Sequence, residues 1–157
     1  MRLMGRTAVQ VLKALLELAQ EPETWRSVKE LAQAQALPEP YLEQLLLRLR
    51  RAGVLEARRG RNGGYRLACP PAELPLGRVL DAAGALPGAA GHQELGAAEP
   101  AIEPAIEPAT ERVAALLQQR LNQALNRELQ RLTLQELLFD LRSARAALSE
   151  EGGLILG

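Results

Sequence analysis

The chain has 157 residues, of which 47% are hydrophobic and only 3% aromatic, and its formal net charge is zero. This composition favours packed helices over a β-sandwich, because strands prefer aromatic and β-branched side chains. The single cysteine, Cys69, excludes an intrachain disulfide and with it a secreted fold held together by disulfides.

The first segment predicts an amphipathic helix over about residues 7–20. It carries charges at Lys13 and Glu17, which argue against a signal peptide. No stretch approaches the roughly 18 apolar residues of a membrane span, so we expect a cytoplasmic protein with no membrane partner. The apolar face expected for this helix consists of Val9, Leu12, Leu15, Leu16 and Ala19.

A helix-turn-helix pattern follows. Ser27 and Glu30 form a capping box, which predicts a short second helix over about 28–35. Pro38 and Pro40 forbid a helix interior but are tolerated at a helix start, so a third helix is expected from about Pro38 or Glu39 to Arg51. Trp25, just before the second helix, is expected to anchor the packing of this unit. The apolar face of the third helix is Leu42, Leu45, Leu46 and Leu49.

The periodicity changes after Gly53, where a left-handed helix cap is expected. Residues 54–58 and 64–68 predict two short strands around a glycine-rich turn at Asn62-Gly63. A two-stranded hairpin directly after a helix is typical of a wing, and a fourth short helix is expected over about 76–84.

Charge is concentrated around this wing. Residues 1–87 hold 13 Lys and Arg against 9 Asp and Glu, whereas residues 88–157 hold 6 against 10. Between Arg48 and Arg66, seven arginines accompany one acid, Glu56. A local basic cluster of this kind indicates a polyanionic partner, even in a protein that is neutral as a whole.

Residues 88–110 change in character. The tetrad EPAI begins at Glu99 and again at Glu103, and proline at every fourth position argues against a regular helix, so we expect a flexible or extended connector. Beyond it, leucines repeat every four residues and predict a helix of about 20 residues. A second capping box at Thr133 predicts a last helix over about 134–148, ended by Gly152-Gly153.

The order of elements predicts a mainly α fold: a winged helix-turn-helix domain (1–87) with a two-stranded wing, the connector (88–110), and a helical dimerisation region (111–157) with a long helix. In such a fold one helix enters the major groove of DNA and the wing lies on the minor groove or the backbone. Gly60, Gly63 and Gly64 would let the wing backbone approach the DNA. The candidate DNA-binding residues are Ser27, Glu39, Tyr41, Glu43, Gln44, Arg48, Arg51, Arg58, Arg59, Arg61, Asn62 and Gly63.

The long C-terminal helix predicts a homodimer. Because it follows a loose connector, this helix has little of its own chain to bury against, so its leucine stripe is better explained as an interface between two copies than as intramolecular core. The candidate dimerisation residues are Val113, Leu117, Leu121, Leu125 and Leu129.

Two segments carry a family resemblance, YLEQLLLRLRRAGVL (41–55) and RRGRNGGYRLA (58–68). With the rest of residues 1–87, they resemble the IscR-like (Rrf-two) family of bacterial transcription regulators. The resemblance implies a homodimer that binds roughly palindromic operator DNA, with Tyr41, Glu43 and Gln44 at contact positions and Arg59 in the minor groove. Pro38 and Pro40 depart from the small polar residues common there.

The sensor of many family members is missing. They hold an iron–sulfur cluster through three closely spaced cysteines, whereas residues 88–110 contain none. Because clusters depend on thiolates, we expect no cofactor and no metal, and interpret Cys69 as a small apolar side chain. The alternative is a cluster held by Cys69, His92 and the carboxylates of 94–107.

Two other function classes compete with a DNA-binding regulator. The first is a protein-interaction module that keeps the fold and has lost DNA binding. The second is an enzyme, which has almost no support: the chain lacks a nucleophile–base pairing and a GxxxxGK phosphate loop, and it has one histidine.

Overall fold

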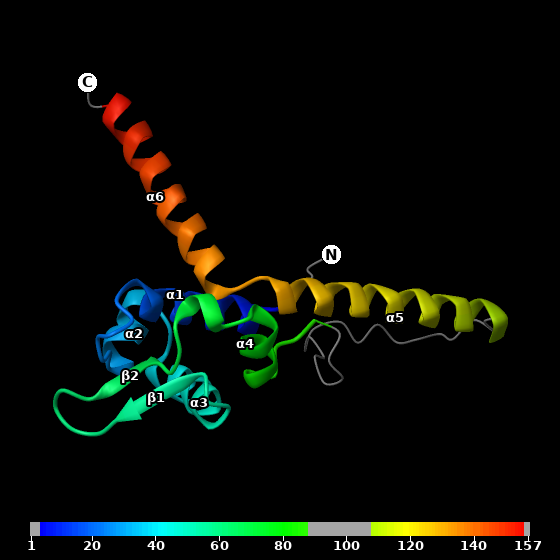
Figure 1. Cartoon of the computed structure of the whole chain (residues 1–157), viewed down its shortest axis with the longest axis horizontal. Coiled ribbons are helices and arrows are strands. Elements are labelled where there is room, and N and C mark those ends of the chain that lie inside the picture. Colours follow the sequence, from blue (N-terminus) through cyan, green and yellow to red (C-terminus); the bar gives the residue numbers. More distant parts are fainter. Residues whose placement is uncertain (1–3, 88–107, 156–157) are drawn as a thin grey trace.

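The computed structural model describes residues 4–87 and 108–155, which form a mostly helical protein with one small antiparallel sheet (Figure 1). In chain order the elements are α1 (Arg6–Gln20), α2 (Val28–Gln35), α3 (Glu39–Arg51), β1 (Leu55–Arg58), β2 (Gly64–Leu67), the 3-10 turn η1 (Pro71–Glu73), α4 (Leu76–Ala82), α5 (Pro108–Arg131) and α6 (Leu134–Ile155). The predicted winged helix-turn-helix is confirmed. No described helix is both long and apolar enough to cross a membrane.

The helices of the helix-turn-helix begin where the sequence predicts. The Ser27 hydroxyl accepts a hydrogen bond from the Glu30 backbone N–H at 3.1 Å, so α2 begins with the predicted cap. Pro38 stands at the N-cap of α3 with an extended backbone. One feature of the turn was not predicted: Ala36 adopts a left-handed conformation, with φ of 53°, a place where glycine or asparagine is more usual.

A third backbone segment pairs with the hairpin of the wing. β1 pairs with β2 in antiparallel register, with Leu55 opposite Leu67 and Arg58 opposite Gly64. The backbone of Arg26 pairs in turn with Tyr65, through N···O distances of 2.9 and 2.7 Å. The segment that leads into α2 is therefore fastened to the outer edge of the wing.

The stripe predicted for α1 is partly wrong. Leu15 and Ala19 are buried as expected, and the half-buried Leu12 and Leu16 pack against the core, but Val9 is 40% exposed. This helix is apolar on more than one side, so periodicity alone does not select the side that packs. The residues it buries are Ala8, Val11, Ala14, Leu15, Leu18 and Ala19.

The C-terminal helices are longer than predicted. α5 already begins at Pro108, inside the predicted connector, because proline is tolerated at the first helical position. α6 continues to Ile155, so the prediction that Gly152-Gly153 ends it is wrong; each glycine costs a helix only about 1 kcal/mol relative to alanine. The remaining predicted connector, 88–107, lies outside the described residues.

The joint between α5 and α6 is anchored in the core of the N-terminal half. The Leu76 N–H donates to the Leu132 carbonyl at 2.8 Å, and the Leu134 N–H donates to the Leu74 carbonyl at 3.0 Å. The Leu134 side chain is fully buried within the same core as α1, α3 and α4. From this joint the two helices extend away from the rest of the molecule in different directions (Figure 1).

Candidate nucleic-acid interface

The packing of α3 decides which of its side chains face outward. Leu42, Leu45, Leu46 and Leu49 are buried, as predicted. Because these positions share one side of the helix, the charged and polar positions between them project to solvent. The exposed candidates on this surface are Glu39, Glu43, Gln44, Arg48 and Arg51.

Tyr41 differs from the other candidates on α3. Its hydroxyl donates a hydrogen bond to Gln10 Oε1 at 2.7 Å and lies 3.5 Å from the Thr7 hydroxyl. Both partners belong to α1, and sequence spacing does not reveal this contact. The Tyr41 proton is thus already used within the protein, although 37% of the residue stays exposed.

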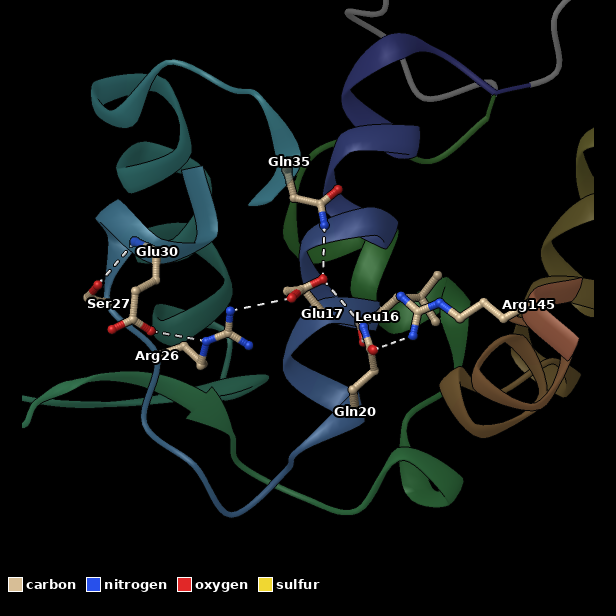
Figure 2. A network of polar contacts seen from close by, with 8 residues as sticks. All are labelled: Leu16, Glu17, Gln20, Arg26, Ser27, Glu30, Gln35 and Arg145. Atoms are coloured by element: carbon tan, nitrogen blue, oxygen red, sulfur yellow. Dashed lines mark hydrogen bonds and ion pairs between the residues drawn. The ribbon is translucent and has the colours of Figure 1, made fainter. Parts of the chain in front are cut away.

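A polar network holds the helix-turn-helix on α1 (Figure 2). The Glu17 carboxylate accepts from Arg26 and from Gln35, each at 3.3 Å, so it joins α1 to the segment before α2 and to the last residue of α2. Arg26 also pairs with Glu30 at 3.1 Å. Glu17 and Arg26 are mostly buried, which protects this pair from screening better than a surface ion pair.

The same network extends to α6. Gln20 donates to Glu17 at 3.3 Å, and its own Oε1 accepts from Arg145 of α6 at 2.6 Å. Figure 2 shows Arg145 pointing from α6 toward Gln20. Side chains of α2, α1 and α6 are therefore connected by successive hydrogen bonds.

The turn of the wing separates its arginines into two groups. Arg58 folds back and donates to the Asn62 carbonyl at 2.5 Å. Arg59 and Arg61 are exposed, and within the described part of the chain neither has a hydrogen-bond or ion-pair partner. A Cβ atom on Gly63 would collide with the Arg58 carbonyl oxygen, so glycine is required there by the hairpin itself.

Trp25, just before α2, contacts arginines of the wing, which the sequence does not predict. The guanidinium carbon of Arg66 lies 4.3 Å from the centroid of the Trp25 ring, and that of Arg58 lies 4.7 Å from it. Both distances are within the range of cation–π contacts. Arg66 also pairs with Glu56 across the hairpin at 3.1 Å.

Two further interactions involve α3 and are not predicted from the sequence. Arg78 of α4 donates to the carbonyls of Ala52 and Gly53 at 3.5 and 3.4 Å, which places a positive charge at the C-terminal end of α3. Burial of the Tyr65 hydroxyl raises the pKa of this residue. The nearby charge of Glu43 raises the pKa further, whereas Arg50 lowers it.

Of the residues considered for an atypical cluster, Cys69 is the one that lies in the described part of the chain. Cys69 is half-buried and packs against the core. No group of three His, Cys, Asp or Glu residues that could hold a metal occurs among residues 4–87 and 108–155. His92 and the carboxylates of 94–107 lie outside the described residues.

The predicted dimerisation stripe is mostly uncovered. Val113, Leu117 and Leu121 are 66%, 57% and 54% exposed, and no residue of α5 is fully buried. Leu125 is half-buried, and Leu129 packs against the core of its own chain. The stripe therefore divides into an exposed outer part and an inner part that joins α5 to the body.

Comparison with known proteins places these features in a family. The sequence matches the model of the Rrf2 family, described as an iron-dependent transcriptional regulator, over residues 4–140. A Synechocystis sp. protein named as an HTH-type transcriptional regulator is 51% identical over 72 residues, which cover 45% of this chain and 49% of the relative. The chain spans about half the length of the curated relatives it matches.

Solved structures extend the similarity over most of the chain. IscR of T. potens is 27% identical with a TM-score of 0.61, over 89% of this chain and 88% of that one. CymR, the global cysteine regulator of B. subtilis, is 28% identical with a TM-score of 0.61, over 88% of this chain and 97% of that one. These relatives are named as regulators rather than as enzymes. The chain belongs to the Rrf2 family of transcriptional regulators.

Proposed function

We propose that the protein is a sequence-specific DNA-binding regulator that acts as a homodimer. The observation that carries the proposal is the outward polar side of α3, which stands beside a wing whose Arg59 and Arg61 have no partner among the described residues. A helix of this kind fits the major groove, where glutamate can accept from cytosine and glutamine can pair with adenine. The wing arginines then reach the backbone or a narrow minor groove.

The exposed part of α5 supports the second copy. α5 has 24 residues, with four large apolar side chains exposed and none fully buried, and such an exposed apolar stripe is typical of a protein–protein interface. Those side chains are Val113, Leu116, Leu117 and Leu121, which recur at helical spacing along one stripe. A second α5 would cover the stripe, and the resulting two-fold symmetry predicts a roughly palindromic operator.

The available side chains do not fit an iron–sulfur cluster held by thiolates. The whole chain has one cysteine, and Cys69 is half-buried beside the wing rather than in the segment before α5. One thiolate cannot supply the four ligands that such clusters usually take. We therefore propose regulation without a cluster, and the atypical site of Cys69, His92 and carboxylates is the alternative that a test must address.

A binding selection tests the proposed function. Purified full-length protein is incubated with genomic DNA fragments, and recovered fragments are compared by gel shift against a scrambled duplex of equal length. We expect a shared, roughly palindromic sequence and an affinity that falls steeply with salt, as phosphate neutralisation requires. If no fragment is selected and a protein is the only partner found, the interaction-module interpretation replaces this one.

A further inference from the structure

The outer surface of the wing is organised around Trp25. Leu55, Tyr65 and Leu67 turn one side of the hairpin toward the core. Because side chains alternate along a strand, Arg58 and Arg66 must lie on the opposite side. Arg26 pairs with Tyr65 in antiparallel fashion, so Trp25 comes level with Arg66 on that same outer side.

Gly64 explains how Arg58 also reaches the ring. Arg58 of β1 is paired with Gly64 of β2. On its other side, β2 pairs with the segment that carries Trp25 and Arg26, so Gly64 lies between this segment and Arg58. Gly64 has no side chain and a φ of 142°, and a Cβ atom there would collide with the Arg26 carbonyl oxygen. The indole can therefore receive guanidinium groups from both strands, at 4.3 and 4.7 Å.

These contacts connect the helix-turn-helix to the tip of the wing. Trp25 lies two residues before Ser27, the cap of α2. Arg58 joins the ring at one end and, through its bond to the Asn62 carbonyl, closes the turn that carries Arg59 and Arg61. A hairpin with strands of four residues is only marginally stable without such support.

We propose that Trp25 is a positioning residue for DNA recognition, which holds the wing tip at a fixed angle to α3 through Arg58 and Arg66. This inference rests on the proposed function. Fixed in this way, Arg59 and Arg61 meet the DNA in register with the recognition helix. Arg58 and Arg66 themselves are occupied by the ring, so they act on selectivity for the operator more than on general attraction to phosphate.

The test compares Trp25→Leu, which keeps apolar volume without an aromatic face, with Trp25→Phe, which keeps a weaker one. Affinities are measured for the duplex that the wild-type protein selects and for a scrambled duplex of equal length. For Trp25→Leu we expect a loss of roughly five- to tenfold on the selected duplex, from the strength of two cation–π contacts, and no loss on the scrambled one. Trp25→Phe should fall between the wild type and Trp25→Leu.

A salt titration gives a second readout that a general packing role would not change. Release of Arg58 from the ring makes it available to a phosphate, so the dependence of log affinity on log salt should steepen by up to about one for Trp25→Leu. In the double variant with Arg59→Ala, Trp25→Leu should add little to the effect of Arg59→Ala alone. Additive losses would contradict action through the wing tip.

The outcomes separate the two proposals. If the wild-type protein selects no DNA, the proposed function fails and this inference fails with it. If the wild type selects an operator and Trp25→Leu binds it equally well, the inference alone is wrong. Equal losses on the selected and scrambled duplexes, together with a lower melting temperature, would show that Trp25 only stabilises the fold.

Discussion

The Tyr41 hydroxyl, on the helix expected to read DNA, donates its proton to Gln10 Oε1 of α1 at 2.7 Å. A residue whose position on α3 suggests a DNA contact thus also fastens that helix to its neighbour. The Tyr41→Phe variant separates the two roles. We expect the free energy of unfolding to fall by about 1 kcal/mol, as for loss of one hydrogen bond, while operator affinity changes less than about twofold.

Urea unfolding and operator titration measure the two effects on the same samples. Gln10→Leu serves as the control, because it removes the same bond from the other side and leaves the tyrosine intact. A large affinity loss in Tyr41→Phe that is absent in Gln10→Leu would show that the hydroxyl contacts DNA directly.

The wing should carry a measurable share of DNA affinity through Arg59. Replacing Arg59 by Ala is expected to weaken operator binding by about 1–3 kcal/mol, because its charge is exposed and has no partner among the described residues. Arg142 of α6 is also exposed, and Arg142→Ala removes the same charge away from the interface. Equal binding by wild type and Arg59→Ala, to a defined operator at low salt, would remove the wing from the proposal.

The exposed apolar side chains of α5 should control the association of two copies of the chain. Leu117→Glu places a charge among the exposed apolar side chains, so we expect the dimer to dissociate and operator affinity to fall with it. Gln118→Glu adds the same charge at the neighbouring exposed position and should leave the dimer intact. Sedimentation equilibrium reports the mass of each variant. A Leu117→Glu protein that remains a dimer would place the interface elsewhere.

Stability should decline in alkali because of Tyr65. Its pKa in the folded protein is raised above the usual value of 10.0, chiefly by burial. The unfolded chain therefore ionises first, so the folded state loses stability as pH rises from 10.0 toward the raised value. Tyr65→Phe keeps the ring without the ionisable group and should show a weaker decline. Urea midpoints measured below and above pH 10.0 provide the comparison.

Protein purified without oxygen should be colourless. With one cysteine in the chain, reconstitution with iron and sulfide is expected to give no visible absorbance band. Absorbance that disappears in both Cys69→Ala and His92→Ala would establish the atypical cluster instead. Cys69→Ala should otherwise leave DNA binding unchanged.

Local sequence signals predicted most of the elements but few of their contacts. Ser27 with Glu30 marked the start of α2, and Gly53, with φ of 78°, is the left-handed residue expected after α3. These features depend on neighbours a few residues away. The Tyr41–Gln10 bond joins residues 31 positions apart. The bonds from Arg78 to the carbonyls at the end of α3 join residues 25 and 26 positions apart. Such pairs follow from the tertiary arrangement, which periodicity does not encode.

The errors have a similar origin. Sequence spacing places Val9 on the apolar face of α1, but this helix is apolar on several sides and its packing partners decide which side is buried. Gly152-Gly153 predicts a helix end, yet α6 continues through both residues, because glycine lowers helix stability without preventing a helix. The contact of Trp25 with the wing is not predicted either, because Arg58 and Arg66 come more than 30 residues later in the chain.

The joint between α5 and α6 has a consequence for how the two halves of the chain are tied. Leu132 and Leu134 bond to the backbone on either side of Pro75, and the Leu134 side chain fills the core. The N-terminal half is thus attached to α5 and α6 by noncovalent contacts as well as through residues 88–107. A protease cut within 88–107 should leave two fragments that still migrate together until a denaturant separates them.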